Sequence, residues 1–92
     1  MDRVVLSAAA TKDLRKLPEN VRWKFDFWVK QVTVSGIAEV RKIPGFHDEP
    51  LSGERLGQRS IRLSRSYRAF YRVFKDGIIH LISVEEINKH EY

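Results

Sequence analysis

One amphipathic helix places the strongest constraint on the fold of this chain. Between residues 19 and 34, apolar side chains recur every three or four positions, the spacing that aligns them on one face of an α-helix. A face this apolar has to be buried against another layer of structure. The residues that predict it are Val21, Phe25, Trp28, Val29 and Val32.

A strand and a second helix are expected before it. Val4-Val5-Leu6 has the β-branched composition of a short strand. Ser7 can cap a helix over residues 8–17, and Pro18 then ends that helix. The two helices are therefore expected to form an antiparallel hairpin that packs on a sheet.

After a loop rich in Pro and Gly, the pattern changes from helical to alternating. Asp76-Gly77 is typical of a tight hairpin turn, and the polar residues 85–92 are expected to form a tail. The order β-α-α-β-β-β predicts an α+β fold, a mostly antiparallel sheet with the helical hairpin packed on one face. The three later strands are expected over residues 58–63, 67–74 and 78–84.

Length and composition limit the class of protein. A chain of 92 residues that is 42% hydrophobic and 32% charged fits a single globular domain, residues 1–92. The absence of cysteine excludes disulfides, thiol nucleophiles and thiolate metal sites. No apolar run approaches the length of about 20 residues that a membrane span needs. A cytoplasmic protein without a membrane segment is expected.

The positive charge is concentrated in one segment. From Arg55 to Lys75 the sequence has seven basic residues and no acidic residue, and six of the seven are arginines. Arginine suits phosphate because its planar guanidinium can donate two parallel hydrogen bonds. The segment therefore predicts a polyanionic partner, most simply a nucleic acid, although a basic surface without a dedicated partner remains the alternative.

Strand alternation divides residues 67–74 into two faces. The face with Tyr67, Ala69, Tyr71 and Val73 is more apolar and is expected to pack on the helices. The other face is expected to be open, with arginines for phosphates and aromatic rings that can stack on bases. Arg62, Arg68 and Arg72 are expected on the open face. The residues predicted to bind RNA are Arg59, Arg62, Arg65, Arg72 and Lys89.

The side chains needed for metal-free RNA cleavage are also present. That reaction needs a base for the 2′-hydroxyl, a cation for the phosphorane and an acid for the leaving 5′-oxygen. Asp48 and Glu49 precede the basic strands, and His90 and Tyr92 follow the last one. A surface loop acid and a frayed terminus are the plainer interpretations. No histidine or carboxylate spacing matches a metal-ligand motif, so no metal and no cofactor are predicted.

These residues also carry a family resemblance. Glu49-Pro50-Leu51-Ser52-Gly53, Gly57 to Leu63, Ser66 to Tyr71 and a terminal Tyr resemble the RelE/ParE superfamily of toxins from bacterial toxin–antitoxin pairs, over essentially the whole chain. The branch that it resembles most is that of RelE and YoeB. The resemblance implies a ribosome-dependent endoribonuclease that cuts mRNA in the A site, beside the 16S rRNA, and is silenced by a cognate antitoxin.

The resemblance also implies roles for single residues. In YoeB-like members an acid next to a Pro-Leu pair is the general base, which here matches Glu49. The strand arginine that stabilises the scissile phosphate matches Arg68. YoeB-like members end in His-Tyr, with the His as the acid, which here matches His90. In this sequence Glu91 lies between His90 and Tyr92. A RelE-like tail would instead use Lys89 with Tyr92, and both assignments stay open.

Two further questions remain open at this level. ParE-type members of the superfamily inhibit DNA gyrase instead, and a nucleic-acid-binding module without catalysis is a third possibility. On the long helix, Trp23 and Phe27 lie roughly opposite the apolar face. They are expected either to be covered by the segment around Ile43 and Phe46 or to form part of a groove that binds the antitoxin.

Overall fold

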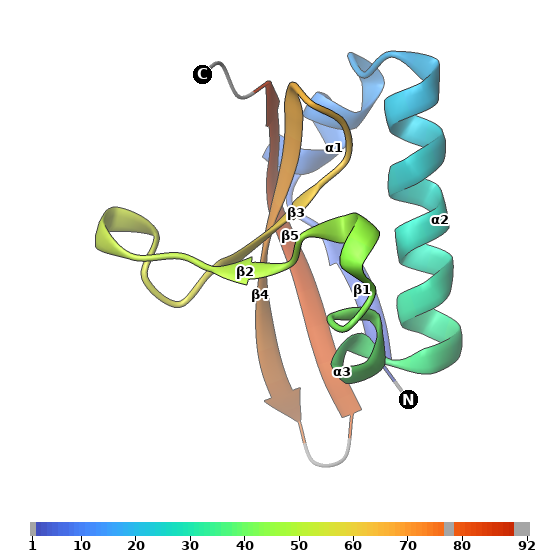
Figure 1. Cartoon of the computed structure of the whole chain (residues 1–92). Coiled ribbons are helices and arrows are strands. Elements are labelled where there is room, and N and C mark those ends of the chain that lie inside the picture. The colour runs from blue at the N-terminus through green and yellow to red at the C-terminus, as the bar shows by residue number, and fades with distance from the viewer. Residues whose placement is uncertain (1, 77–78, 90–92) are drawn as a thin grey trace.

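The protein, described here as a computed structural model for residues 2–76 and 79–89, is a sheet with helices on one face (Figure 1). The sheet has five strands in the order β1-β5-β4-β3-β2. β1 runs parallel to β5, and the other neighbours are antiparallel. This confirms the predicted α+β fold. The strands are β1 (Asp2–Leu6), β2 (Glu49–Pro50), β3 (Arg59–Arg62), β4 (Tyr67–Asp76) and β5 (Ile79–Lys89).

The helices form the second layer, and α2 lies lengthwise along the sheet in Figure 1. They are α1 (Ala8–Arg15), α2 (Glu19–Ser35) and α3 (Ile37–Val40), with 3₁₀ turns η1 (Pro44–Phe46) and η2 (Gly53–Arg55) in the loops. Ser7 caps α1 as predicted, because its Oγ accepts a hydrogen bond of 2.9 Å from the Ala10 N–H. No helix in the described part of the chain is long and apolar enough to cross a membrane.

The core lies between α2 and the sheet. The predicted apolar face of α2 is confirmed, since Val21, Phe25, Trp28 and Val32 are each no more than 2% exposed. The Trp28 ring packs against Tyr71 of β4 with 5.4 Å between the ring centroids. Burying a side chain of this size stabilises the fold by about 1.5–3 kcal/mol. The helix face and the predicted face of β4 therefore form one core.

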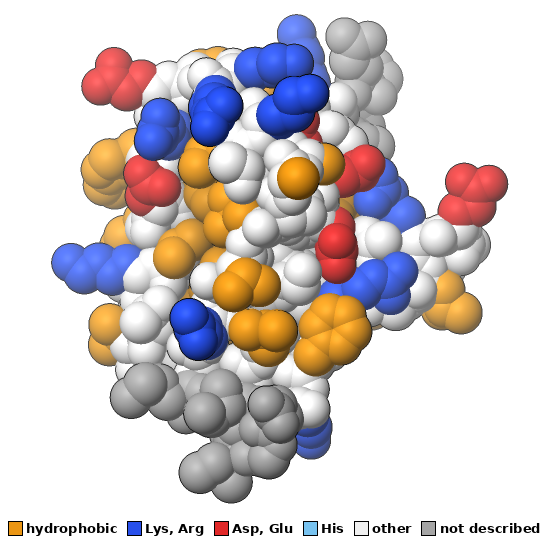
Figure 2. Space-filling view, turned by 180° about the vertical axis from the view of Figure 1, so that it is seen from behind, with side chains coloured by type: hydrophobic (Ala, Val, Ile, Leu, Met, Phe, Trp, Pro, Cys, Tyr) orange, Lys and Arg blue, Asp and Glu red, His pale blue; other side chains and the backbone are white. Residues whose placement is uncertain are grey.

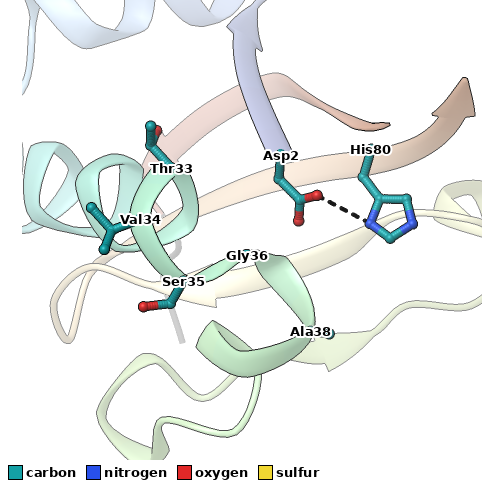
Figure 3. Close-up of a pocket in the computed structure, with 7 residues that line it drawn as sticks. All are labelled: Asp2, Thr33, Val34, Ser35, Gly36, Ala38 and His80. Carbon is teal, nitrogen blue, oxygen red and sulfur yellow. Dashed lines mark ion pairs between the residues drawn. The ribbon is translucent and has the colours of Figure 1, made fainter. Parts of the chain in front are cut away.

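Asp2 connects β1 to the far end of the helical layer. Its Oδ2 accepts a 2.6 Å hydrogen bond from the Ile37 N–H at the start of α3, and its Oδ1 lies 3.2 Å from His80 Nδ1. Gly36, between α2 and α3, has φ of +84°, a conformation that favours glycine. Figure 3 shows Asp2 and His80 facing each other beside a hollow of about 480 Å³, while Ser35 points away from them.

The prediction of a polar tail from residue 85 was wrong, because β5 continues to Lys89. A β-bulge at Glu85 shifts the register between Tyr71↔Val84 and Phe70↔Glu86. Two contacts from α1 and its cap hold this bulge. The Ser7 hydroxyl donates to the Glu85 carbonyl at 2.7 Å, and the Ile87 N–H donates to Asp13 Oδ2 at 3.0 Å. The strand pattern is hard to recognise in the sequence because Ile87 is the one core side chain among residues 85–89.

The predicted hairpin joins β4 and β5. The two strands pair in antiparallel register down to Asp76 and Ile79. Gly77, the second residue of the predicted turn, lies outside the described residues together with Ile78.

The outer side of α2 fits neither expectation completely. Phe27 stacks on Phe46 with 6.3 Å between the centroids, and Phe46 is only 2% exposed. The segment around Phe46 therefore covers Phe27, as one of the two expectations predicted. Trp23 stacks on Phe27 at 5.7 Å but is 68% exposed. An aromatic side chain this exposed leaves the second expectation, a partner surface, open at Trp23.

Candidate active site

A pocket of about 400 Å³ opens on the sheet face opposite the helices, called the open face below. It lies where β2, β3 and β4 meet the last residues of β5. Figure 2 shows basic and acidic side chains side by side near the loop between β2 and β3, which projects from the molecule. The pocket is lined by Glu49, Leu51, Arg55, Ser60, Arg68, Phe70, Asn88 and Lys89.

Glu49 and Arg68 form the centre of this pocket. Both lie on the open face, because Glu49 pairs with Ser60 in the β2–β3 register and Ser60 pairs with Phe70 in the β3–β4 register. The Arg68 Nη1 donates to Glu49 Oε1 at 2.9 Å and to the buried Ser60 Oγ at 3.3 Å. The Arg68 side chain is 13% exposed and that of Glu49 is 55% exposed. The pocket therefore combines a held guanidinium with a solvent-accessible carboxylate.

A second arginine lies beside this pair. Arg62 is the direct cross-strand partner of Arg68. Two like charges at opposed positions of a sheet destabilise it, and an anion bound between them would offset the repulsion. The Nε of Arg62 is buried and has no hydrogen-bond partner among the described residues. Arg62 therefore adds a second positive charge next to Arg68, which favours an anionic ligand such as a phosphate nearby.

Asp48, one residue before Glu49, has different surroundings. Its side chain is 1% exposed, and Arg59 Nε lies 2.6 Å from its Oδ1. Its Oδ2 accepts a hydrogen bond from the Tyr71 hydroxyl. Arg59 shares the helix-facing side of the sheet with Tyr71, its register partner. Arg59, predicted to bind RNA, thus lies away from the pocket, in an ion pair with a buried carboxylate.

These contacts shift two pKa values. Burial raises the pKa of Tyr71, and the hydrogen bond to the negative Asp48 raises it further. Burial acts to lower the pKa of Arg59, but the hydrogen bond and the charge of Asp48 outweigh it, so the net shift is upward. At neutral pH Arg59 is therefore charged and Tyr71 is neutral.

The remaining arginines differ in their surroundings. Arg55 pairs with Glu86, and Arg72 Nε lies 4.0 Å from Glu85 Oε1. Two arginines of the basic segment therefore form ion pairs with acids of β5 that lie outside this segment in the sequence. Arg65 is exposed in the turn between β3 and β4, and no acid of residues 2–76 or 79–89 forms an ion pair with it.

The tail candidates are described only in part. Lys89 lines the pocket as the last residue of β5. His90 and Tyr92 lie outside the described residues. Within the described part of the chain, no three His, Asp or Glu side chains are grouped so that they could hold a metal ion.

Sequence reasoning missed several residues of the pocket. Arg55 was counted only as part of the basic segment, and Ser60 and Asn88 were not selected. The alternation of β3 places Ser60 on the face of Arg62, so that signal was available. Asn88 could not be found in this way, because the β-bulge and the length of β5 were not evident from a polar segment.

No protein-family model matches the sequence, and no curated protein matches it. Solved structures do match. A YoeB/ParE toxin from Agrobacterium tumefaciens superposes with a TM-score of 0.72 at 19% identity, over 97% of this chain and 99% of that one. YafQ from E. coli gives 0.75 at 13% identity, over 97% and 93%. The YoeB–YefM complex from Staphylococcus aureus gives 0.71 at 18% identity, over 99% of each chain.

These matches define the class of fold. At such identities a likeness demonstrates a shared fold and no more. The chain has the RelE-like fold of the YoeB and YafQ toxins over nearly its whole length, as the sequence motifs predicted.

Proposed function

We propose that this protein is the toxin of a toxin–antitoxin pair and acts as an endoribonuclease on mRNA in the ribosomal A site. The observation that carries the proposal is the Glu49–Arg68 pair, at 2.9 Å in an open pocket. Arg62 lies directly opposite Arg68, which adds a second positive charge for a phosphate. The fold shared with YoeB and YafQ toxins supports the same conclusion.

The reaction uses the side chains in sequence. Glu49 removes the proton from the 2′-hydroxyl of the nucleotide before the cut, and the 2′-oxygen then attacks the adjacent phosphorus. Arg68 stabilises the negative charge that develops on the phosphorane oxygens. The bond from phosphorus to the 5′-oxygen breaks, and that oxygen takes a proton from an acid. The products are a 2′,3′-cyclic phosphate and a 5′-hydroxyl.

The acid belongs to the end of the chain. His90 has an ordinary pKa of about 6.5 for its residue type, so it can donate a proton near neutral pH. The alternative is Lys89 with Tyr92, and Lys89 lines the pocket. Cleavage by the wild-type protein should fall as the pH rises past the His90 pKa, and His90→Gln should remove that dependence. An unchanged pH profile in His90→Gln would assign the role to Lys89 with Tyr92.

Two partners follow from this function. The first is a cognate antitoxin, because the toxin YoeB of Staphylococcus aureus has been solved in complex with YefM. The second is the ribosome, whose 16S rRNA and A-site mRNA would meet the arginines of the open face and of the turn at Arg65. Co-purification with the product of an adjacent small gene tests the first partner.

The experiment that tests the function compares two readouts. Purified protein is added to ribosomes programmed with a defined mRNA, and the cut ends are mapped and analysed for a cyclic phosphate. The same protein is added to DNA gyrase in a supercoiling reaction. We expect cleavage inside the A-site codon and no effect on supercoiling. Inhibited supercoiling with intact mRNA would favour a gyrase inhibitor, and binding without either effect would indicate a non-catalytic module.

A further inference from the structure

Phe70 lies on the open face of the sheet, yet it is only 7% exposed. The side chain of Arg55 covers it, with the guanidinium carbon 3.9 Å from the centroid of the ring. That distance is typical of a cation packed over an aromatic face. The strand pattern predicts that the Phe70 ring is open to a ligand. A ligand that enters the pocket instead contacts the outer side of the Arg55 guanidinium.

The guanidinium is held in place from several directions. Its Nη1 donates to Gln58 Oε1 at 3.0 Å, and its Nη2 donates to Glu86. The backbone of Arg55 is fixed as well, because its N–H donates to the Ser52 carbonyl at 3.3 Å and its carbonyl accepts from Gln58 at 2.9 Å. A side chain fixed in this way loses little further entropy when a ligand packs on it.

The arrangement favours a planar ligand over a phosphate. A guanidinium binds phosphate through the N–H groups along its edge. Both terminal nitrogens of Arg55 already donate to Gln58 and Glu86, while the side chain is still 35% exposed. Its inner flat side covers Phe70, and part of its hydrogen-bonding edge is taken by Gln58 and Glu86, so its flat outer side is well suited to a π-face. Nucleobases stack on arginine planes and aromatic rings in many RNA-binding proteins.

We propose that Arg55, supported by Phe70, is the platform on which one nucleobase of the A-site codon stacks while Glu49 and Arg68 act on the neighbouring phosphate. The proposal rests on the proposed function, since it takes mRNA as the ligand of the pocket. Arg55 and Phe70 line the same pocket of about 400 Å³ as Glu49 and Arg68. The base and the scissile phosphate would thus be held by separate groups of side chains.

The test measures binding to an mRNA that cannot react. Ribosomes are programmed with mRNA whose A-site codon carries 2′-deoxyribose, with all three bases present or with one base removed at each position in turn. The dissociation constant of the wild-type protein should rise about 5- to 150-fold at one of the three positions, the equivalent of a stacking energy of about 1–3 kcal/mol. Arg55→Lys, which keeps the charge and removes the plane, should bind the intact codon more weakly and show no further loss at that position.

Two more variants complete the test. Phe70→Leu keeps an apolar side chain beneath Arg55 and should also reduce the effect of removing the base. Arg22→Lys, on the exposed side of α2, should behave as the wild type. The platform would be overturned if removing the base raises the dissociation constant of Arg55→Lys by the same factor as that of the wild type. It would also be overturned if removing a base weakens wild-type binding at none of the three positions. Base-dependent binding without cleavage of the ribose mRNA would instead overturn the proposed reaction and leave the platform intact.

Discussion

Asp48 and Glu49 are adjacent in sequence and carry the same charge, but they lie in opposite environments. Asp48 is 1% exposed and pairs with Arg59 on the helix-facing side of the sheet. Glu49 is 55% exposed and pairs with Arg68 in a pocket on the open face. Asp48 lies just before β2 and contacts Arg59 and Tyr71, whereas Glu49 is the first residue of β2 and contacts Arg68 on the other side of the sheet.

The difference shows that an acid–arginine pair has no fixed meaning. A buried carboxylate whose oxygens are both hydrogen-bonded is costly to disturb and has no access to a substrate. An accessible carboxylate beside a held arginine can accept a proton from a ligand that the arginine binds. We therefore propose that Asp48 serves the stability of the fold and that Glu49 serves the proposed reaction.

The largest expected effect is on the open face. Arg68→Ala should lower the rate of mRNA cleavage about 10²–10³-fold, the usual cost of losing one preorganised electrostatic contact. Arg68→Lys should recover only part of the rate, since a point charge does not replace the planar fork. Single-turnover cleavage on programmed ribosomes measures both. A stably folded Arg68→Ala protein with full activity would refute the assignment.

The next effect is on the buried pair. Asp48→Asn leaves Arg59 charged and only 24% exposed, without its ion-pair partner. The free energy of unfolding should fall by about 3 kcal/mol, the lower end for a broken buried pair because Arg59 keeps some solvent contact. Urea denaturation measures this change. Glu49→Gln serves as the matched control and should shift the unfolding free energy by about 0.5 kcal/mol or less.

A pH dependence follows from the raised pKa of Tyr71. The folded state holds this proton more tightly than the unfolded chain, whose tyrosine pKa is about 10. The stabilisation is therefore complete below pH 10 and is lost above it, at up to about 1.4 kcal/mol per pH unit. Tyr71→Phe should be less stable at pH 7 and should lose less stability between pH 9.5 and 11. If both proteins lose the same unfolding free energy between pH 9.5 and 11, a group other than Tyr71 causes the alkaline loss of stability.

The smallest expected effect is a difference in unfolding free energy between substitutions at two aromatic residues of α2. Phe27 is 42% exposed and stacks on the buried Phe46, whereas Trp23 is 68% exposed. Phe27→Ser should lower the free energy of unfolding by about 1 kcal/mol, and Trp23→Ser by about 0.5 kcal/mol or less. Thermal melts compare the two. If Trp23→Ser still folds and its toxicity is no longer suppressed by the antitoxin, Trp23 belongs to the antitoxin surface.

Much of the fold could be predicted because its signals are periodic. The face of α2 with Phe25 and Trp28 repeats at helical spacing, and the alternation of β4 assigns Tyr71 to the core. The end of β5 could not be predicted, since only Ile87 there faces the core and the bulge depends on contacts with Ser7 and Asp13. These contacts span more than 70 positions of sequence.

The site was predicted less completely, for a related reason. Glu49 and Arg68 were selected from a motif and meet in the structure. A charge count treats every arginine of the basic segment alike, but Arg55 meets Glu86 and Arg59 meets Asp48 only after the chain folds. Whether an arginine contributes to the pocket or to the core depends on those partners, which sequence spacing does not reveal.

The most direct measurement compares Glu49→Gln with Asp48→Asn in single-turnover mRNA cleavage, at a temperature at which both variants are folded. Glu49→Gln should unfold like the wild type and cleave at least about 10²-fold more slowly, because the base is lost. Asp48→Asn should be less stable and cleave at nearly the wild-type rate. Normal cleavage by Glu49→Gln, or a folded Asp48→Asn that does not cleave, would contradict the division of roles between the two acids.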